Sequence, residues 1–231
     1  MAGVDFDKEN ICVVIPAFNE GEKVGGVLSK VRDLKYPVLL VDDGSTDETP
    51  RIAKALTGVH VISLSPNQGK GAALRKGMDW CLARNYAAVL LMDADGQHRP
   101  EELGLFLDEL RRGEGDVIVG NRMLHPEGMP LLRRATNQFL SWVTSRLTHQ
   151  RIPDSQCGFR VLKAEVLRKL SLRTTHFEIE SEMLFQASKH GFKIVSIPIR
   201  SVYEGAKSQI HPLKDTLRFF RFLFTYFFQK I

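Results

Sequence analysis

Short runs of β-branched and aliphatic residues alternate with helical periodicity through the first half of the chain, and this alternation constrains the fold most. The predicted strands there are 11–15, 38–41, 59–64, 87–92 and 116–119. The predicted helices are 20–31, 47–56, 71–84 and 100–112. Strands joined through helices run parallel to one another. The sequence therefore predicts an α/β fold with a Rossmann-like, mostly parallel sheet that helices cover on both faces.

The regular alternation of strands and helices ends at about residue 120. The second half predicts a helix at 134–148, a strand at 159–162, a helix at 178–190, a strand at 193–197 and a C-terminal helix. A chain of 231 residues is long enough for one sizeable core, and no repeat or linker divides it. We expect one domain over residues 1–211, followed by an apolar helix at 212–231.

Cysteine usage and the absence of long apolar runs limit the classes of protein. Cys12, Cys81 and Cys157 are odd in number and widely spaced, so neither a disulfide framework nor a zinc site is indicated. The first ten residues lack the apolar run of a signal peptide, and no segment has the roughly 18 apolar residues of a membrane span. We expect a reduced, cytoplasmic chain. Its net charge of +5 suits an anionic ligand, an acidic lipid surface or simply a solvated basic face.

Two acidic clusters follow predicted strands. They are Asp42-Asp43-Gly44-Ser45 and Asp93-Ala94-Asp95-Gly96. Ligands of parallel sheets bind beyond the carboxyl ends of the strands, which is where both clusters lie. Because strand side chains alternate, Asp93 and Asp95 can face one side and bind Mg²⁺ or Mn²⁺, with a diphosphate completing the coordination. The alternative for either cluster is an ordinary turn.

The sequence does not match other common ligand-binding and catalytic motifs. Gly69-Lys70 is similar to part of a Walker loop, but Leu64 stands where its first glycine is required and Gly71 where its Ser or Thr is required. No GxGxxG follows the first strand, and no GxSxG occurs. A dinucleotide-dependent oxidoreductase and an α/β-hydrolase are therefore not indicated.

Three segments resemble the motifs of family 2 glycosyltransferases, in order and in spacing. They are 14–20 (VIPAFNE), 41–47 (VDDGSTD) and 93–98 (DADGQH). Together with 120–122 (GNR) and 157–160 (CGFR), the last of these resembles the branch that transfers mannose or glucose to polyprenyl or dolichyl phosphate. The resemblance covers about residues 10–210. It implies the GT-A fold, with a nucleotide-sugar half at 10–119 and an acceptor half at 120–211.

The resemblance also implies site residues. Nucleotide-sugar contacts would come from Pro16, Phe18, Glu20, Val41, Asp43, Asp93, Ala94, Asp95 and Lys207, and the metal would be held by Asp95 and Gln97. The acceptor phosphate would be bound by Arg122 and by Arg133 or Arg134. Lys207 lies where the family has a basic loop, but this sequence departs from the family pattern there. Tyr203 and Glu204 occupy the place of the arginine that the family has in this loop.

The residues themselves suggest two further candidates. Arg160, like Arg122, stands near a glycine and a strand end, and a guanidinium binds two phosphate oxygens at once. Asp154, in the loop before Cys157, is a candidate general base, although an anionic acceptor needs only orientation. The predicted catalytic residues are thus Asp95, Arg122 and Asp154.

Six of the fourteen phenylalanines lie between Phe219 and Phe228, beside Arg218, Arg221 and Lys230. A segment this apolar must be covered by lipid or by protein, and it is too short to span a bilayer. It predicts an amphipathic helix that lies on a membrane surface or packs against protein.

The expected activity is inverting, metal-dependent transfer of a hexose from GDP-mannose or UDP-glucose to a polyprenyl phosphate, at the cytoplasmic face of a membrane. No nucleic acid is expected as a partner, and a homodimer or a separate membrane subunit both stay open. One alternative is a transferase of the same fold that acts on a sugar hydroxyl. A second alternative is a non-catalytic membrane-binding module.

Overall fold

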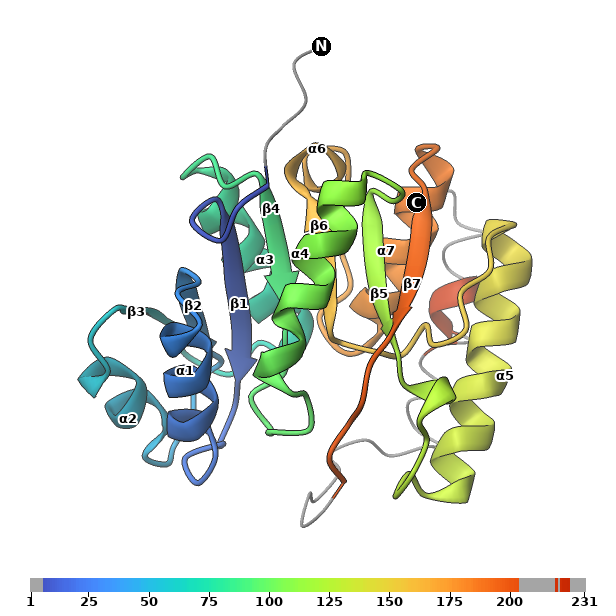
Figure 1. Ribbon diagram of the computed structural model, residues 1–231. Helices are drawn as coiled ribbons and strands as arrows, with labels where there is room; N and C mark the ends of the chain where they lie inside the picture. Colours follow the sequence, from blue (N-terminus) through green and yellow to red (C-terminus); the bar gives the residue numbers. More distant parts are fainter. Residues whose placement is uncertain (1–5, 204–218, 220, 225–231) are drawn as a thin grey trace.

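The computed structural model describes residues 6–203, 219 and 221–224 (Figure 1). Its strands are β1 (Ile11–Ala17), β2 (Val38–Asp42), β3 (Val59–Ser63), β4 (Ala88–Leu91), β5 (Val117–Asn121), β6 (Arg160–Lys163) and β7 (Ile194–Pro198). They form one sheet in the order β3-β2-β1-β4-β6-β5-β7. Only β6 runs antiparallel to its neighbours, β4 and β5, within this part of the chain. The predicted mostly parallel α/β sheet is confirmed.

The helices alternate with the strands as predicted. They are α1 (Val24–Asp33), α2 (Thr49–Ala55), α3 (Lys70–Leu82), α4 (Leu103–Arg112), α5 (Leu131–Thr148), α6 (Ala164–Leu167) and α7 (Glu178–Lys189), with short 3₁₀ turns η1 (Pro100–Glu102) and η2 (Arg122–Leu124). Figure 1 shows α1 and α4 in front of the sheet and α3 and α7 behind it. Helix α6, a single turn, was not predicted, and α5 begins three residues before its predicted start.

Burial on both faces explains why the strands read as continuous apolar runs. All seven residues of β1 and all five of β2 are buried, although β1 contains Pro16 and β2 ends in Asp42. A strand covered by helices on each side has no solvent face, so it gains from an apolar residue at every position. The strand–helix alternation and the uninterrupted runs thus have one physical cause.

The strand order creates a crevice at one edge of the sheet. The chain moves outward from β1 through β2 to β3 and then returns to place β4 on the other side of β1. The carboxyl ends of β1 and β4 are therefore neighbours at the point where the strand order changes direction, at the lower edge of the sheet in Figure 1. Such a switch of direction is the usual ligand site of an open α/β sheet.

The predicted C-terminal helix at 212–231 lies largely outside the described residues. Phe219 and Phe222 are described, are helical, and are buried in a small cluster with Leu140 and Phe185. These two phenylalanines therefore pack against protein. In the described part of the chain, no helix combines the length and apolar character that crossing a membrane requires.

Close packing of α3 on β1 makes Gly77 a sensitive position. A Cβ added there would overlap Val14 Cγ1 in the core, whereas a Cβ on Gly104 in α4 would meet nothing within 4 Å. We expect Gly77→Ala to lower the free energy of unfolding by about 1–3 kcal/mol through overpacking. Gly104→Ala should raise it by about 0.5 kcal/mol, because the unfolded chain loses freedom. Urea midpoints measure both, and equal midpoints for the two variants would contradict this packing.

Candidate active site

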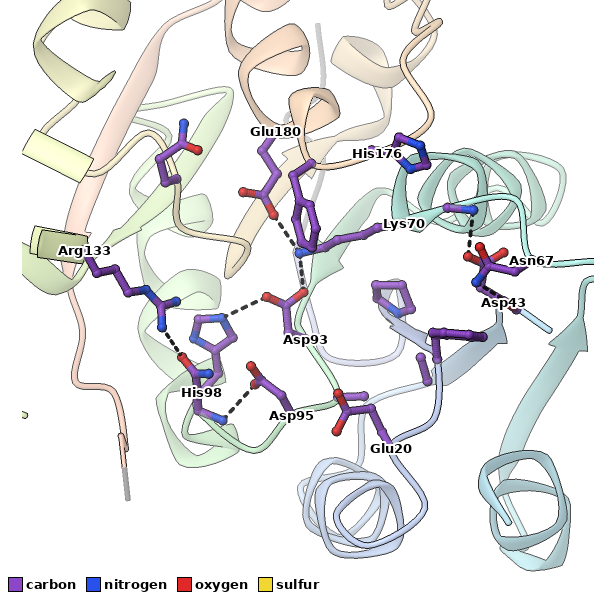
Figure 2. A pocket seen from close by; sticks show the side chains of 18 of the residues that line it. Glu20, Asp43, Asn67, Lys70, Asp93, Asp95, His98, Arg133, His176 and Glu180 are labelled. Atoms are coloured by element: carbon purple, nitrogen blue, oxygen red, sulfur yellow. Dashed lines mark hydrogen bonds and ion pairs between the residues drawn. The ribbon is translucent and has the colours of Figure 1, made fainter. Parts of the chain in front are cut away.

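A cavity of about 250 Å³ opens at the carboxyl ends of β1 and β4. The end of β1 supplies Pro16 to its lining, the loop after β1 supplies Phe18 and Glu20, and the loop after β4 supplies Asp93 and Asp95 (Figure 2). β4 itself ends at Leu91, so the two aspartates belong to the loop rather than to the strand. Both reach the cavity as predicted, but the loop conformation, and not strand alternation, brings them there.

The residues after β2 hold neighbouring loops in place. The backbone N–H groups of Gln68 and Gly69 each donate to the Asp43 carboxylate at 2.8 Å. Asp43 thereby fixes the entry to α3 while lining the cavity. Asp42 instead accepts the N–H of Ser45 at 3.0 Å, so the turn interpretation of this cluster is right for Asp42.

Lys70 joins two carboxylates across the cavity. Its Nζ lies 2.6 Å from Asp93 Oδ1 and 2.7 Å from Glu180 Oε1 (Figure 2). Burial by itself lowers the pKa of Lys70, but the two carboxylates outweigh burial and raise that pKa. In the same way burial favours neutral Asp93, and the charge of Lys70 outweighs it and lowers the pKa of Asp93. Lys70 and Asp93 are therefore both ionised, and Glu180 is the second carboxylate against the Lys70 ammonium.

Lys70 and Glu180 line the cavity but were not predicted as site residues. Lys70 is the first residue of α3, where a positive charge opposes the helix dipole. That mismatch is a signal in the sequence, since an unfavourable charge at a helix start needs a compensating partner. The partner itself was not foreseeable, because Glu180 lies 110 residues away on α7.

The cavity has an acidic side that suits a divalent cation. Burial, and then the charges of Asp95 and Asp93, raise the pKa of Glu20 to about 6. No cluster of three or more His, Cys, Asp or Glu side chains that could hold a metal ion occurs among the described residues. Asp95 and the Gln97 side chain supply few protein ligands, which fits Mg²⁺ or Mn²⁺ bound mainly through phosphate oxygens.

The opposite side of the cavity is basic. Arg122 lines it and is held by the buried carboxylate of Asp154, with Nε to Oδ2 at 2.8 Å and Nη2 to Oδ1 at 2.9 Å. Burial alone lowers the pKa of Arg122, but Asp154 outweighs it and raises that pKa well above its usual value. The backbone N–H of Arg122 also donates to Asp154, so this carboxylate fixes both the chain and the side chain.

Arg133, from the first turn of α5, is a second cation of the basic side. Its Nη1 donates to Gln97 Oε1 at 3.3 Å, and burial, followed by the charge of Arg122, lowers the pKa of Arg133. Its Nε and the nearby Nδ2 of Asn137, one turn on, are buried and have no hydrogen-bond partner among the described residues. Unsatisfied buried donors beside a cavity indicate the place of an acceptor-rich ligand.

The structure does not bring every predicted residue to the cavity. Val41 is enclosed in β2, and Arg134 points elsewhere than its neighbour Arg133. Lys207 lies outside the described residues. Asp154 is buried behind Arg122, so its position does not suit a general base that touches a substrate. Its carboxylate instead holds the Arg122 side chain.

Arg160 is also placed away from the cavity, contrary to its predicted phosphate contact. Its side chain has no exposed surface. Nε donates to the Cys157 carbonyl at 3.0 Å and Nη1 donates to the Glu180 carbonyl at 2.7 Å. The guanidinium thus orders the backbone beside Glu180.

Comparisons with known proteins agree with this site. Residues 12–171 match the family model for glycosyl transferase family 2. Polyprenol monophosphomannose synthase of Mycolicibacterium smegmatis is 33% identical over 201 residues, covering 81% of this chain and 75% of that protein. UDP-N-acetylglucosamine–dolichyl-phosphate N-acetylglucosaminyltransferase of Methanococcus voltae is 30% identical over 215 residues, covering 84% and 86%.

The chain therefore belongs to glycosyltransferase family 2, in the branch that includes these polyprenyl- and dolichyl-phosphate transferases. This confirms the resemblance and makes the protein a glycosyltransferase, which removes the non-catalytic alternative. Glucosyl-3-phosphoglycerate synthase of Mycobacterium tuberculosis, crystallised with Mn²⁺, UDP and phosphoglyceric acid, has a TM-score of 0.68 at 20% identity, covering 91% of this chain and 74% of that one. This likeness confirms the predicted GT-A fold.

The two roles considered for Asp154 predict different behaviour of Asp154→Asn. The amide has the same shape but leaves Arg122 as an uncompensated buried charge, so unfolding free energy should fall by about 3 kcal/mol. Asp116→Asn, which breaks a partly exposed pair with Lys163, should lower it by about 1 kcal/mol or less. Urea titration measures both. Wild-type stability with abolished turnover would instead support Asp154 as a general base.

Proposed function

We propose that this glycosyltransferase moves mannose or glucose from a nucleotide-sugar to a polyprenyl phosphate, with a divalent cation and with inversion at the sugar. The observation that carries the proposal is the division of one cavity into an acidic and a basic side. Glu20, Asp93 and Asp95 lie on the first side, and Arg122 and Arg133 lie on the second. A reaction between two phosphate-bearing substrates needs both sides.

The acidic side suits the donor. Asp43 lies at the end of the cavity that would hold the nucleoside, with Asp93 and Asp95 between it and Arg133 (Figure 2). Pro16 and Phe18 also line the cavity. Asp95 and Gln97 would hold Mg²⁺ or Mn²⁺, which when bound neutralises charge that develops on the leaving diphosphate. The structural neighbour with Mn²⁺ and UDP supports this by fold analogy alone. We also place Lys207 near the donor as a proposal from the family resemblance.

The basic side suits an acceptor that is already an anion. Among the described residues, two carboxylates near this side are already paired with cations, Asp154 with Arg122 and Glu180 with Lys70. An acceptor phosphate needs no deprotonation, whereas a sugar hydroxyl does. The contrast favours the phosphate over the hydroxyl alternative, and the substrate names of the relatives agree with it.

In the proposed reaction an acceptor phosphate oxygen forms a bond to the sugar's anomeric carbon. The bond from that carbon to the diphosphate breaks, and the nucleoside diphosphate leaves. Arg133 lies across Asp93 and Asp95 from Asp43, so acceptor and nucleoside would occupy opposite ends of the cavity (Figure 2). Attack opposite the leaving group gives inversion. Residues 10–119 and 120–211 would then be the donor and acceptor halves.

A lipid acceptor implies a membrane location. We propose a peripheral enzyme on the cytoplasmic face, with the acceptor phosphate at headgroup level. GDP-mannose and UDP-glucose are both retained as donors. A homodimer and a separate membrane subunit are both compatible with this location.

Asp95→Asn tests the cation site. The amide keeps the size of the side chain but removes its charge, so transfer of radiolabelled sugar into an organic-soluble product should fall at least about a hundredfold, on the scale of removing one electrostatic stabiliser. Asp108→Asn, at an exposed position of α4 that does not line the cavity, should keep most activity. Full activity of Asp95→Asn over a range of Mg²⁺ and Mn²⁺ concentrations would contradict the assignment.

Arg133→Ala tests the acceptor side. Loss of a charge-assisted phosphate contact of about 2 kcal/mol should raise the apparent KM for polyprenyl phosphate by about thirtyfold and leave the donor KM nearly unchanged. Arg134→Ala is the matched control, because this adjacent arginine does not line the cavity. Equal effects of the two substitutions, or an effect of Arg133→Ala on the donor alone, would reverse the assignment.

A further inference from the structure

Gln156 lines the cavity from the loop between α5 and β6, and its side-chain amide has a fixed orientation. Its Nε2 donates to Ser155 Oγ and to Ser181 Oγ, each at 3.2 Å. Both serines are buried, with exposed fractions of 0% and 1%. The carbonyl oxygen Oε1 makes no hydrogen bond to the residues that the structure describes and is not buried among them. Gln156 therefore presents a hydrogen-bond acceptor to the cavity.

The loop that carries Gln156 runs against two carboxylates of the site. A Cβ on Gly158 would lie 2.7 Å from Asp93 Oδ2, so the loop passes directly beside the Asp93 carboxylate. On the other side, the partner of the Gln156 amide is Ser181, which follows Glu180 on α7. These contacts place Gln156 beside the part of the cavity that Asp93 and Glu180 line.

Hydrogen bonds to two helices hold this loop in place. The backbone N–H of Ser155 donates to Ser141 Oγ on α5 at 2.9 Å. The buried Arg160 donates from Nη2 to the Ser155 carbonyl at 3.2 Å and from Nη1 to the Glu180 carbonyl of α7 at 2.7 Å. An acceptor that is already ordered loses little conformational entropy when a ligand binds to it. The amide of Gln156 is thus prepared for a donor group on a ligand.

The proposed reaction leaves this part of the cavity to the donor sugar. The anomeric carbon is bonded first to the diphosphate, near Asp95, and then to the acceptor phosphate, near Arg133. Figure 2 shows Glu180 on the opposite side of Asp93 from Asp95. A sugar ring that lies between the two phosphates would therefore face the wall formed by Asp93, Glu180 and Gln156.

We propose that Gln156 is a specificity-determining residue, whose Oε1 accepts a hydrogen bond from one hydroxyl group of the donor hexose. The inference rests on the proposed function for the places of the two phosphates. It goes further by assigning a side chain that contacts the sugar rather than the nucleoside, the cation or the acceptor. A site that hydrogen-bonds a substrate hydroxyl rejects an analogue without it, because the polar group of the protein is left unpaired.

Calorimetric titration without an acceptor separates sugar recognition from catalysis. The full-length protein with Mn²⁺ is titrated with GDP-mannose and UDP-glucose, and with GDP and UDP alone. Gln156→Met keeps the length of the side chain but removes the amide. It should lower the affinity for the donor about tenfold, the effect of one lost hydrogen bond of ordinary strength. Affinity for the matching nucleoside diphosphate, which has no sugar, should change by less than about twofold.

Gln138→Met is the matched control, because Gln138 is an exposed residue of α5 that does not line the cavity. This variant should bind donor and nucleoside diphosphate as the wild type does. Thermal melting checks that both variants fold.

Deoxyfluoro donors identify the hydroxyl group. Fluorine in place of a hydroxyl cannot donate a hydrogen bond. At one ring position the fluorinated donor should bind the wild type about tenfold more weakly than the parent donor. Gln156→Met should bind that analogue and the parent donor equally. Fluorination at the other positions should affect the two proteins by the same factor.

Ser181→Ala tests how the amide is held, and it serves for the same comparison if Gln156→Met does not fold. Removing this hydroxyl loosens the amide, so donor affinity should fall and nucleoside diphosphate affinity should not. In the Gln156→Met background, Ser181→Ala should have no further effect, because residues that act through one contact are not additive. Additive losses would show that the serine acts independently of Gln156.

Three results would overturn the proposal. They are equal losses of donor and nucleoside diphosphate affinity, equal behaviour of Gln156→Met and Gln138→Met, and the lack of any analogue whose penalty disappears in Gln156→Met. A folded wild type that binds neither GDP-mannose nor UDP-glucose would instead contradict the proposed donors, and this inference with them. Normal donor binding and transfer by Gln156→Met would contradict the role of Gln156 alone and leave the proposed function supported.

Discussion

The ion pairs of Lys70 with Asp93 and Glu180 are the interaction on which the site depends. They join the start of α3, the loop after β4 and α7, which are far apart in the sequence. Charges so little exposed are stable only when paired, so each of these groups requires the other two. The pairs hold Asp93 in the cavity as a carboxylate, next to Asp95, and they hold Glu180 against the Lys70 ammonium. The geometry of the donor side follows from this arrangement.

Three arginines near the cavity differ in their partners. Arg122 is held by Asp154 and lines the cavity, and Arg133 reaches the cavity from α5. The guanidinium of Arg160 instead donates its hydrogen bonds to backbone carbonyls. Three guanidiniums within a short part of the chain thus have three different roles, set by burial and partners rather than by residue type.

Much of the fold was predictable because its causes are local. Apolar runs such as Val38 to Val41 and the helical periodicity between them follow from burial on both faces of a parallel sheet. Asp93 and Asp95 were predictable as cavity residues, because the ends of such strands meet at one edge. Lys70, Glu180 and the burial of Arg160 were not, since they depend on contacts between α3, α7 and the loop before β6. Arg160 and Arg122 look alike in the sequence, and only tertiary packing separates them.

The central claim is a transfer between two phosphates at one divided cavity, and the structure of the product tests it most directly. Nuclear magnetic resonance of the isolated lipid product reports both the linkage and the anomeric configuration of the sugar. The account predicts a sugar joined through its anomeric carbon to the acceptor phosphate, with the configuration opposite to that in the donor. Retained configuration, or attachment of the sugar to a hydroxyl group, would contradict it.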